Sequence, residues 1–213
     1  MYRQTFKIAQ WAAVIVAMIA TDMASAAVSA SRLFTRDQFA YAQYFQNSAD
    51  GCESLSIEVF ASKSMTRTNQ IHSFQPTLRA QLSSFNFCTG VSVFQSGANE
   101  SPSIDIRQDL SVASTSGLVV MADENGIQRM LQVNITWSGG ELSTDRTKTV
   151  HTTPLSRTMV RTTGSIRNST AIKGALVLDG IDLLGAGNAV QSSGINGFVT
   201  SSKGSTIEII RTQ

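Results

Sequence analysis

The sequence predicts an all-β, antiparallel domain that is folded as a sandwich or a flattened barrel. Apolar and polar residues alternate along many short segments, which is the pattern of strands with one buried face. Turn signals rich in glycine separate these segments at intervals of about eight to twelve residues. The chain has 3 prolines, and beyond its N-terminal segment no stretch has the period of a long amphipathic helix.

The first residues have the layout of a secretory signal peptide. Arg3 and Lys7 precede an apolar stretch over 8–20, and Ala24-Ser25-Ala26 forms a small-residue cleavage site. A helix over the apolar stretch would rise about 20 Å, which is short of the roughly 30 Å hydrocarbon core of a bilayer. We therefore expect an exported protein, periplasmic or extracellular, with no membrane span after cleavage. The expected organisation is a cleaved signal peptide over 1–26 and a single β-rich domain over 27–213.

The 2 cysteines, Cys52 and Cys88, both follow the expected cleavage site. Two cysteines in a translocated protein most simply form one disulfide. Zinc ligands usually lie two to four residues apart, and neither a C-x-x-C pair nor a nearby histidine is present. The pair is therefore predicted to be a structural disulfide, and no metal site is expected.

The segment over 31–51 admits two interpretations. Its aromatic and apolar residues fit one stripe of a short N-terminal helix over 33–46, or parts of two strands. Either element would end at the turn Asn47-Ser48-Ala49-Asp50-Gly51. After this turn the strand pattern dominates, beginning with Leu55, Ile57 and Val59.

The region over 117–151 is predicted to be a meander. Asp123-Glu124-Asn125-Gly126 reads as a hairpin turn of type I′, because Asn-Gly tolerates positive φ. Leu131, Val133, Ile135 and Trp137 share one parity, so Trp137 is expected to be buried. The polar run over 142–151 is expected to be an exposed edge strand. This meander and the C-terminal strands, over 159–163, 172–178 and 206–210, are expected to form most of the sandwich or barrel.

Most aromatic residues after the signal lie between residues 31 and 94. We interpret this dense region as the heavier side of the core. The functional alternative is a ligand-binding face.

The last eighty residues or so resemble a loose group of small exported bacterial β-rich proteins of unknown function. The motifs in common are Val133-Asn134-Ile135-Thr136-Trp137-Ser138-Gly139, Gly164-Ser165-Ile166-Arg167, Ala171-Ile172-Lys173-Gly174, Asp179-Gly180 and Ser201-Ser202-Lys203-Gly204-Ser205. The resemblance implies a bacterial origin and a β fold. It implies no activity, and it offers no catalytic residue.

The sequence contains no recognisable motif for catalysis or for a cofactor. The two histidines, His72 and His151, fit surface positions better than a catalytic base, and no G-x-S-x-G elbow is present. Gly185-Ala186-Gly187 lacks the third glycine and the βαβ context of a dinucleotide loop. A pair of carboxylates could be brought together by the fold, and its candidates are Asp105, Asp109, Asp123, Glu124, Asp179 and Asp182.

The charges are polarised along the chain, although the total is small. The whole chain has 17 basic and 15 acidic side chains, and removal of Arg3, Lys7 and Asp22 with the signal leaves a net charge of +1. The region over 97–126 is mostly acidic, and the later region over 146–173 contains no acid. That acid-free region contains Arg146, Lys148, Arg157, Arg161, Arg167 and Lys173.

Two interpretations of the acid-free region stay open. These cations could form a basic face for an anionic partner, such as an acidic polysaccharide, lipopolysaccharide or nucleic acid. They could instead protect edge strands from pairing with other chains.

The leading function hypothesis is a non-catalytic exported module for binding or surface assembly at the bacterial envelope or exterior. Its expected partner is an anionic polysaccharide or another envelope polyanion, and no cofactor is expected. One alternative is a secreted polysaccharide hydrolase that uses carboxylates assembled by the fold. The other is a small-ligand carrier, in which the aromatic half lines a barrel mouth.

Overall fold

The computed structural model describes residues 28–68, 71–184 and 190–211, and within these ranges it is all-β. The expected signal peptide over 1–26, with its cleavage site, lies outside the described residues. The strands are β1 (Val28–Ser48), β2 (Glu53–Thr68), β3 (Ile71–Asn86), β4 (Ser92–Asn99), β5 (Ser103–Ile106), β6 (Val112–Ala122), β7 (Gln128–Ser138), β8 (Leu142–Thr152), β9 (Ser156–Asn168), β10 (Ala171–Leu178), β11 (Ile181–Asp182) and β12 (Val190–Arg211).

All of these strands belong to one antiparallel sheet. Their order is β11-β10-β7-β6-β4-β3-β2-β1-β12-β9-β8, and β5 pairs with β6 off this path. The two ends of the sheet, β11 and β8, do not pair, so the sheet is open. The all-β prediction is therefore confirmed, and the flattened barrel is wrong.

The segment expected as a helix or two strands is one long strand. β1 covers 21 residues, and it pairs with β12 on one side and β2 on the other. Ala40, Ala42 and Tyr44 are buried on one face, while Phe39 and Tyr41 lie on the opposite face. The helix over 33–46 is therefore wrong, because backbone pairing with two long neighbours decides the conformation of this segment.

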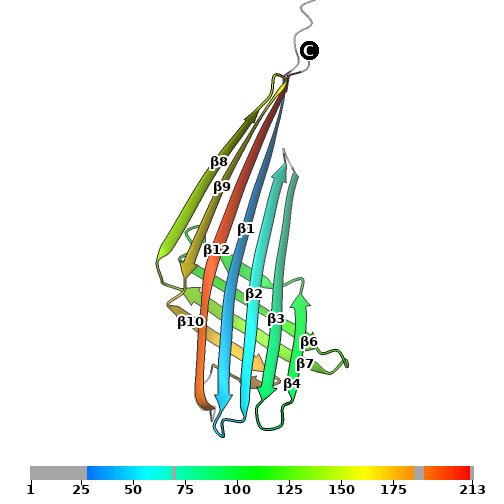
Figure 1. Ribbon diagram of the computed structural model, residues 1–213, viewed down its shortest axis with the longest axis vertical. Coiled ribbons are helices and arrows are strands. Elements are labelled where there is room, and N and C mark those ends of the chain that lie inside the picture. The colour runs from blue at the N-terminus through cyan, green and yellow to red at the C-terminus, as the bar shows by residue number, and fades with distance from the viewer. Residues whose placement is uncertain (1–27, 69–70, 185–189, 212–213) are drawn as a thin grey trace, which may run out of the picture.

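The sheet folds over on itself to enclose the core. In Figure 1, β6, β7 and β10 cross behind the lower halves of β1, β2, β3 and β12. Trp137 of β7 is fully buried, as predicted, and its indole Nε1 donates a hydrogen bond to the Tyr41 carbonyl oxygen at 2.7 Å. The buried residues of the two layers form one core cluster, which includes Ile57, Val59, Leu78, Leu82, Met121, Leu131, Ile135, Leu176 and Val199.

The corner of the fold lies between β4 and β6. These strands are joined at a single register pair, Ser96 with Ala122. The next residue on β4 is Gly97, where a Cβ atom would collide with the Val120 carbonyl oxygen. A glycine is therefore required for the close approach that turns the sheet over.

The predicted meander over 117–151 is correct only in its first half. β6 and β7 pair along their length, and Gly126 has positive φ in the connecting turn. Asn125 does not have positive φ, so the turn is not the expected type I′. β8 pairs with β9 rather than with β7. The chain leaves β7 through Gly139 and Gly140, which both have positive φ and direct it to the far edge of the sheet.

Part of the sheet extends past the sandwich as a single layer, which we call the arm. Figure 1 shows β8, β9, β12 and β1 converging above the crossing strands. β8 forms the edge of the sheet and is exposed at each of its 11 positions, so the predicted edge strand is confirmed. The arm segments are 28–38 of β1, 63–68 of β2, 144–152 of β8, 156–165 of β9 and 201–210 of β12.

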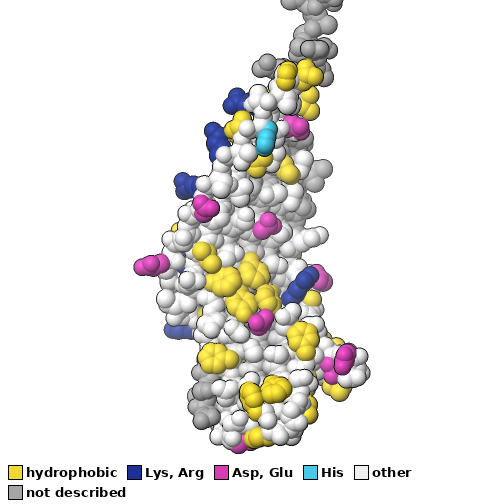
Figure 2. All heavy atoms as spheres, in the orientation of Figure 1, with side chains coloured by type: hydrophobic (Ala, Val, Ile, Leu, Met, Phe, Trp, Pro, Cys, Tyr) yellow, Lys and Arg dark blue, Asp and Glu magenta, His cyan; other side chains and the backbone are white. Residues whose placement is uncertain are grey.

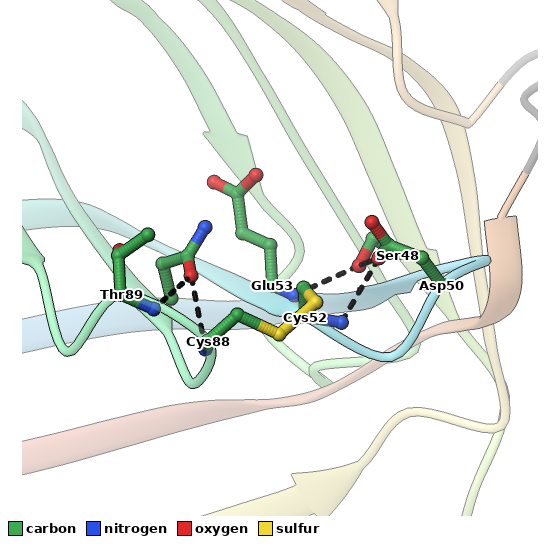
Figure 3. The surroundings of a disulfide bond; sticks show 7 residues. Ser48, Asp50, Cys52, Glu53, Cys88 and Thr89 are labelled. Carbon is green, nitrogen blue, oxygen red and sulfur yellow. Dashed lines mark hydrogen bonds between the residues drawn. A yellow bond between two sulfur atoms is a disulfide. The ribbon is translucent and has the colours of Figure 1, made fainter.

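The predicted disulfide is confirmed. Cys52 and Cys88 are bonded, with Cα atoms 5.3 Å apart, and they connect the β1–β2 turn to the β3–β4 loop at the end opposite the arm (Figure 3). Disulfides persist in oxidising compartments, so the bond is consistent with a protein that resides outside the cytoplasm. Among the described residues no helix is long and apolar enough to cross a membrane.

Asp50 stabilises the turn next to this disulfide. Hydrogen bonds from the Ser48 hydroxyl and the Cys52 amide lower the pKa of Asp50 (Figure 3). A lowered pKa in the folded state means that this stabilisation is present at neutral pH and is lost as the pH falls through the lowered pKa.

The disulfide predicts a simple result for protein purified without reductant. Intact mass measured without reductant should be lower than that of the reduced chain by the two hydrogen atoms lost on oxidation. Alkylation of the native, unreduced protein should label neither Cys52 nor Cys88. Labelling of both thiols in that sample would contradict the bond.

Candidate anion-binding face

The two faces of the arm can be assigned from strand register. Side chains alternate between faces along a strand, and directly paired residues on neighbouring strands point the same way. The face that continues the core of the sandwich contains Gln38, Ala40 and their register partners, and we call it the inner face. The opposite face is the outer face.

Cations from five strands share the inner face of the arm. Strand β8 contributes Arg146 and Lys148, and β9 contributes Arg157 and Arg161, which the sequence had grouped. No acidic residue occupies an inner-face position of the arm segments as defined above. Strands far away in sequence supply five more cations, which are Arg32, Arg36, Lys63, Arg67 and Lys203.

Two pairs of cations lie directly opposite each other on neighbouring strands. Lys148 is the register partner of Arg161, and Arg36 is the register partner of Lys203. Neighbouring strands are about 4.8 Å apart, and like charges in directly opposite positions destabilise a sheet. Within the described residues neither Arg157 nor Arg161 forms an ion pair. Repulsion between these cations therefore lowers the free energy of unfolding of the arm.

The other two predicted site residues lie elsewhere. Arg167 is at the junction with the sandwich, where its guanidinium donates to the carbonyl oxygens of Gly140 at 2.6 Å and Asp109 at 3.3 Å. These bonds give it a structural role. Lys173 is an exposed residue of β10, which pairs with β7 in the other layer. The structure therefore does not bring Arg167 and Lys173 together with the cations of the arm.

The outer face has a different composition. Register places Asp37, Asp145 and Glu208 there, together with His151. Figure 2 shows this side of the molecule, with acidic side chains on the surface and several Lys and Arg side chains along its margin. The arm is thus a thin sheet with opposite charge character on its two faces.

Protection of an edge strand explains only some of the cations on the inner face. Arg146 and Lys148 lie on the edge strand β8, where they would oppose pairing with another chain. Arg36 of β1 and Lys203 of β12 lie where each strand is paired on both sides, whereas Arg32 precedes the first residue of β1 that pairs with β2. Cations on interior strands protect no edge, so they require another explanation.

A cluster of aromatic side chains lies on the outer face of the sandwich rather than in its core. Phe39, Tyr41, Phe60 and Phe198 are partly exposed, with ring centroids 5.2–6.1 Å apart. Burial, and then the Glu58 carboxylate that accepts the Tyr41 hydroxyl at 3.2 Å, raise the pKa of Tyr41. The expectation that the aromatic region forms the core is wrong for these rings, and for the exposed Phe45, Phe85, Phe87 and Phe94. The open sheet also removes the barrel mouth that the carrier hypothesis needed.

Most of the carboxylates considered for a hydrolase instead accept hydrogen bonds or form ion pairs that stabilise turns. Asp123 accepts the amides of Asn125 and Ile127, Asp182 accepts that of Leu184, and Asp179 pairs with Arg129 at 3.3 Å. Amide and hydroxyl donation from Ser111 lowers the pKa of Asp109. Within the described ranges no group of three His, Cys, Asp or Glu residues could hold a metal ion.

The like-charge pairs predict an unusual response to salt. Sodium chloride up to a few hundred millimolar should raise the melting temperature, because it screens repulsion between exposed charges. Arg161→Thr should raise the melting temperature at low salt, because it leaves Lys148 without a cation opposite. Arg79→Thr, on the outer face, is the matched control and should produce no such gain. A fall in melting temperature for Arg161→Thr would show that this cation stabilises the arm.

Comparisons with known proteins identify no relative that assigns a function. No protein-family model matches the chain, and no curated protein matches it. One solved structure with some likeness is a protein of Nitrosomonas europaea provisionally assigned as AttH. It is 9% identical, with a TM-score of 0.28, and the match covers 84% of this chain and 52% of that one. This chain therefore spans about half the length of that protein, and the likeness carries no argument about fold or function.

Proposed function

We propose that this chain is an exported, non-catalytic binding protein that holds an anionic polymer against the inner face of its arm. The observation that carries the proposal is the register of five strands, which places nine cations and no acid on the inner-face positions of the arm segments. Cations on strands that are paired on both sides are explained by an anionic partner, since edge protection does not apply there.

The shape of the arm suits an extended ligand better than a compact one. Along the strands, Arg146 and Lys148 are two residues apart, about 6.8 Å, and the pairs of cations on β1, β2 and β9 are four residues apart, about 13.6 Å. Cations in register on neighbouring strands are about 4.8 Å apart. An extended polymer with regularly spaced negative charges can contact many of them at once. Release of its condensed counterions would provide most of the binding free energy, so binding should be weak at high salt.

The export part of the proposal rests on the sequence and the disulfide. The signal-peptide layout over 1–26 and the bond between Cys52 and Cys88 both suit a protein of the periplasm or the exterior. Acidic polysaccharides and other polyanions of the bacterial envelope are the partners that this location would offer.

A matched pair of polymers tests the proposal. The mature protein should bind dextran sulfate at low salt and lose it by a few hundred millimolar sodium chloride, and it should not bind unmodified dextran of the same length. Polygalacturonate provides a carboxylated polymer for comparison. Equal binding to dextran and dextran sulfate would contradict the proposal, and so would no binding to either charged polymer.

A further inference from the structure

A cavity of about 510 Å³ lies where the inner face of the arm meets the sandwich. Its floor comes from β1 and β2, and its wall comes from the end of β5 and the residues that follow. Gln38 holds the wall to the floor, because its buried side-chain amide donates to the Ile106 carbonyl oxygen at 3.3 Å. The lining residues are Arg36, Gln38, Lys63, Met65, Asp105, Ile106, Arg107 and Gln108.

The Arg36 guanidinium is the distinctive group in this cavity. Its Nε and one of its terminal nitrogens are buried and have no hydrogen-bond partner in the protein. A guanidinium cannot lose its proton, so burial of these donors costs free energy unless an acceptor meets them. Their planar arrangement matches two oxygens of a phosphate, sulfate or carboxylate group.

The surroundings of Arg36 favour an anion. Lys63 and Arg107 line the same cavity, and Lys203 is the register partner of Arg36 on β12. Asp105 also lines the cavity, and its carboxylate would repel an anion there. Three cations and one acid line the cavity, so the net charge of its lining is positive.

We infer that this cavity is an oxoanion subsite, in which Arg36 binds one phosphate, sulfate or carboxylate group through two hydrogen bonds. This inference rests on the proposed function for the source of the anionic group. A charged substituent of the polymer bound to the inner face of the arm would reach the cavity. A small free oxoanion is the other source. The arm would then bind the polymer both by non-specific electrostatic attraction and at one site of defined geometry.

Small anions test the subsite without the polymer. The mature protein is titrated with inorganic phosphate and with sulfate at constant ionic strength, balanced with chloride, and binding is followed by calorimetry. We expect saturable binding to one site, at least tenfold weaker in Arg36→Gln. The control is Arg79→Gln on the outer face, away from the cavity, which should bind the small anion as the unchanged protein does.

A second variant covers the case in which Arg36→Gln does not fold. Asp105→Asn removes the one acid among the described residues that line the cavity, and it should bind sulfate severalfold more tightly, which loss of structure could not produce. No saturable binding by the unchanged protein would overturn the subsite, and so would full binding by a folded Arg36→Gln variant.

The two proposals fail in distinguishable ways. Binding of dextran sulfate without saturable binding of sulfate or phosphate would leave the proposed function standing and remove the subsite. Saturable binding of sulfate without binding of dextran sulfate would assign the cavity to a free oxoanion. It would overturn the proposal that the arm binds an anionic polymer.

Discussion

Replacing Trp137 with alanine should lower the free energy of unfolding by about 3–5 kcal/mol. The indole is fully buried between the two layers of the folded sheet. It also donates to the Tyr41 carbonyl oxygen at 2.7 Å, so alanine would leave a cavity and remove this hydrogen bond. Urea denaturation of the oxidised mature protein measures this loss directly.

Trp137→Phe separates the two contributions. Phenylalanine retains most of the buried ring and loses the hydrogen bond, so it should cost about 1–3 kcal/mol. Because Trp11 lies in the expected signal peptide, fluorescence of the mature protein reports Trp137 alone. A red-shifted emission maximum of the native protein, or an alanine variant as stable as the original, would contradict the burial.

Reversing the charge of both Arg157 and Arg161 to glutamate should weaken dextran sulfate binding about a hundredfold at low salt. Both residues lie on the inner face of β9, and Arg161 lies directly opposite Lys148. The new Glu at position 161 would also form a cross-strand pair with Lys148, which favours folding. Loss of binding could therefore not be attributed to unfolding.

Arg79→Glu is the control for this double variant. Arg79 is exposed and pairs in register with Phe60 of the aromatic cluster, on the outer face. A single charge change far from the inner face should reduce binding about threefold or less. If Arg79→Glu weakened binding as much as the double variant, the polymer would be responding to net charge rather than to the inner face.

Local patterns were sufficient to predict β7, β8 and the disulfide. Alternation over 131–137 identified the buried side of β7, with Trp137 on it, because one parity of a half-buried strand is apolar. The polar run over 142–151 identified an edge strand because nothing in it could pack against a core. The disulfide followed from the number of cysteines and from the expectation of export alone.

Strand pairing could not be predicted from local patterns. A hairpin between β7 and β8 is the shortest connection, yet β8 belongs beside β9 at the far edge of the sheet. The polar parity of β8 gives no preference for either neighbour. The long β1 was ambiguous because its aromatic residues fit both a helical stripe and two faces of a strand, and only its pairing with β12 and β2 distinguishes them.

The candidate site was half visible in the sequence. Arg146, Lys148, Arg157 and Arg161 stood out because they share one acid-free stretch. The rest of the basic face was missed because register, which aligns β1, β2 and β12 with β9, is set by tertiary pairing. One signal was present: Arg32 and Arg36 share a parity, as do Lys63 and Arg67, so each pair must share a face of any strand that contains it.

The dependence of polymer binding on salt tests the central claim most directly. The association constant of the mature protein for dextran sulfate is measured across sodium chloride concentrations, and its logarithm is plotted against that of the salt concentration. An inner face that contacts several negative charges at once predicts a slope of about −4 or steeper. A slope shallower than about −1 would contradict the account, because it would mean that the aligned cations of the arm do not bind the polymer.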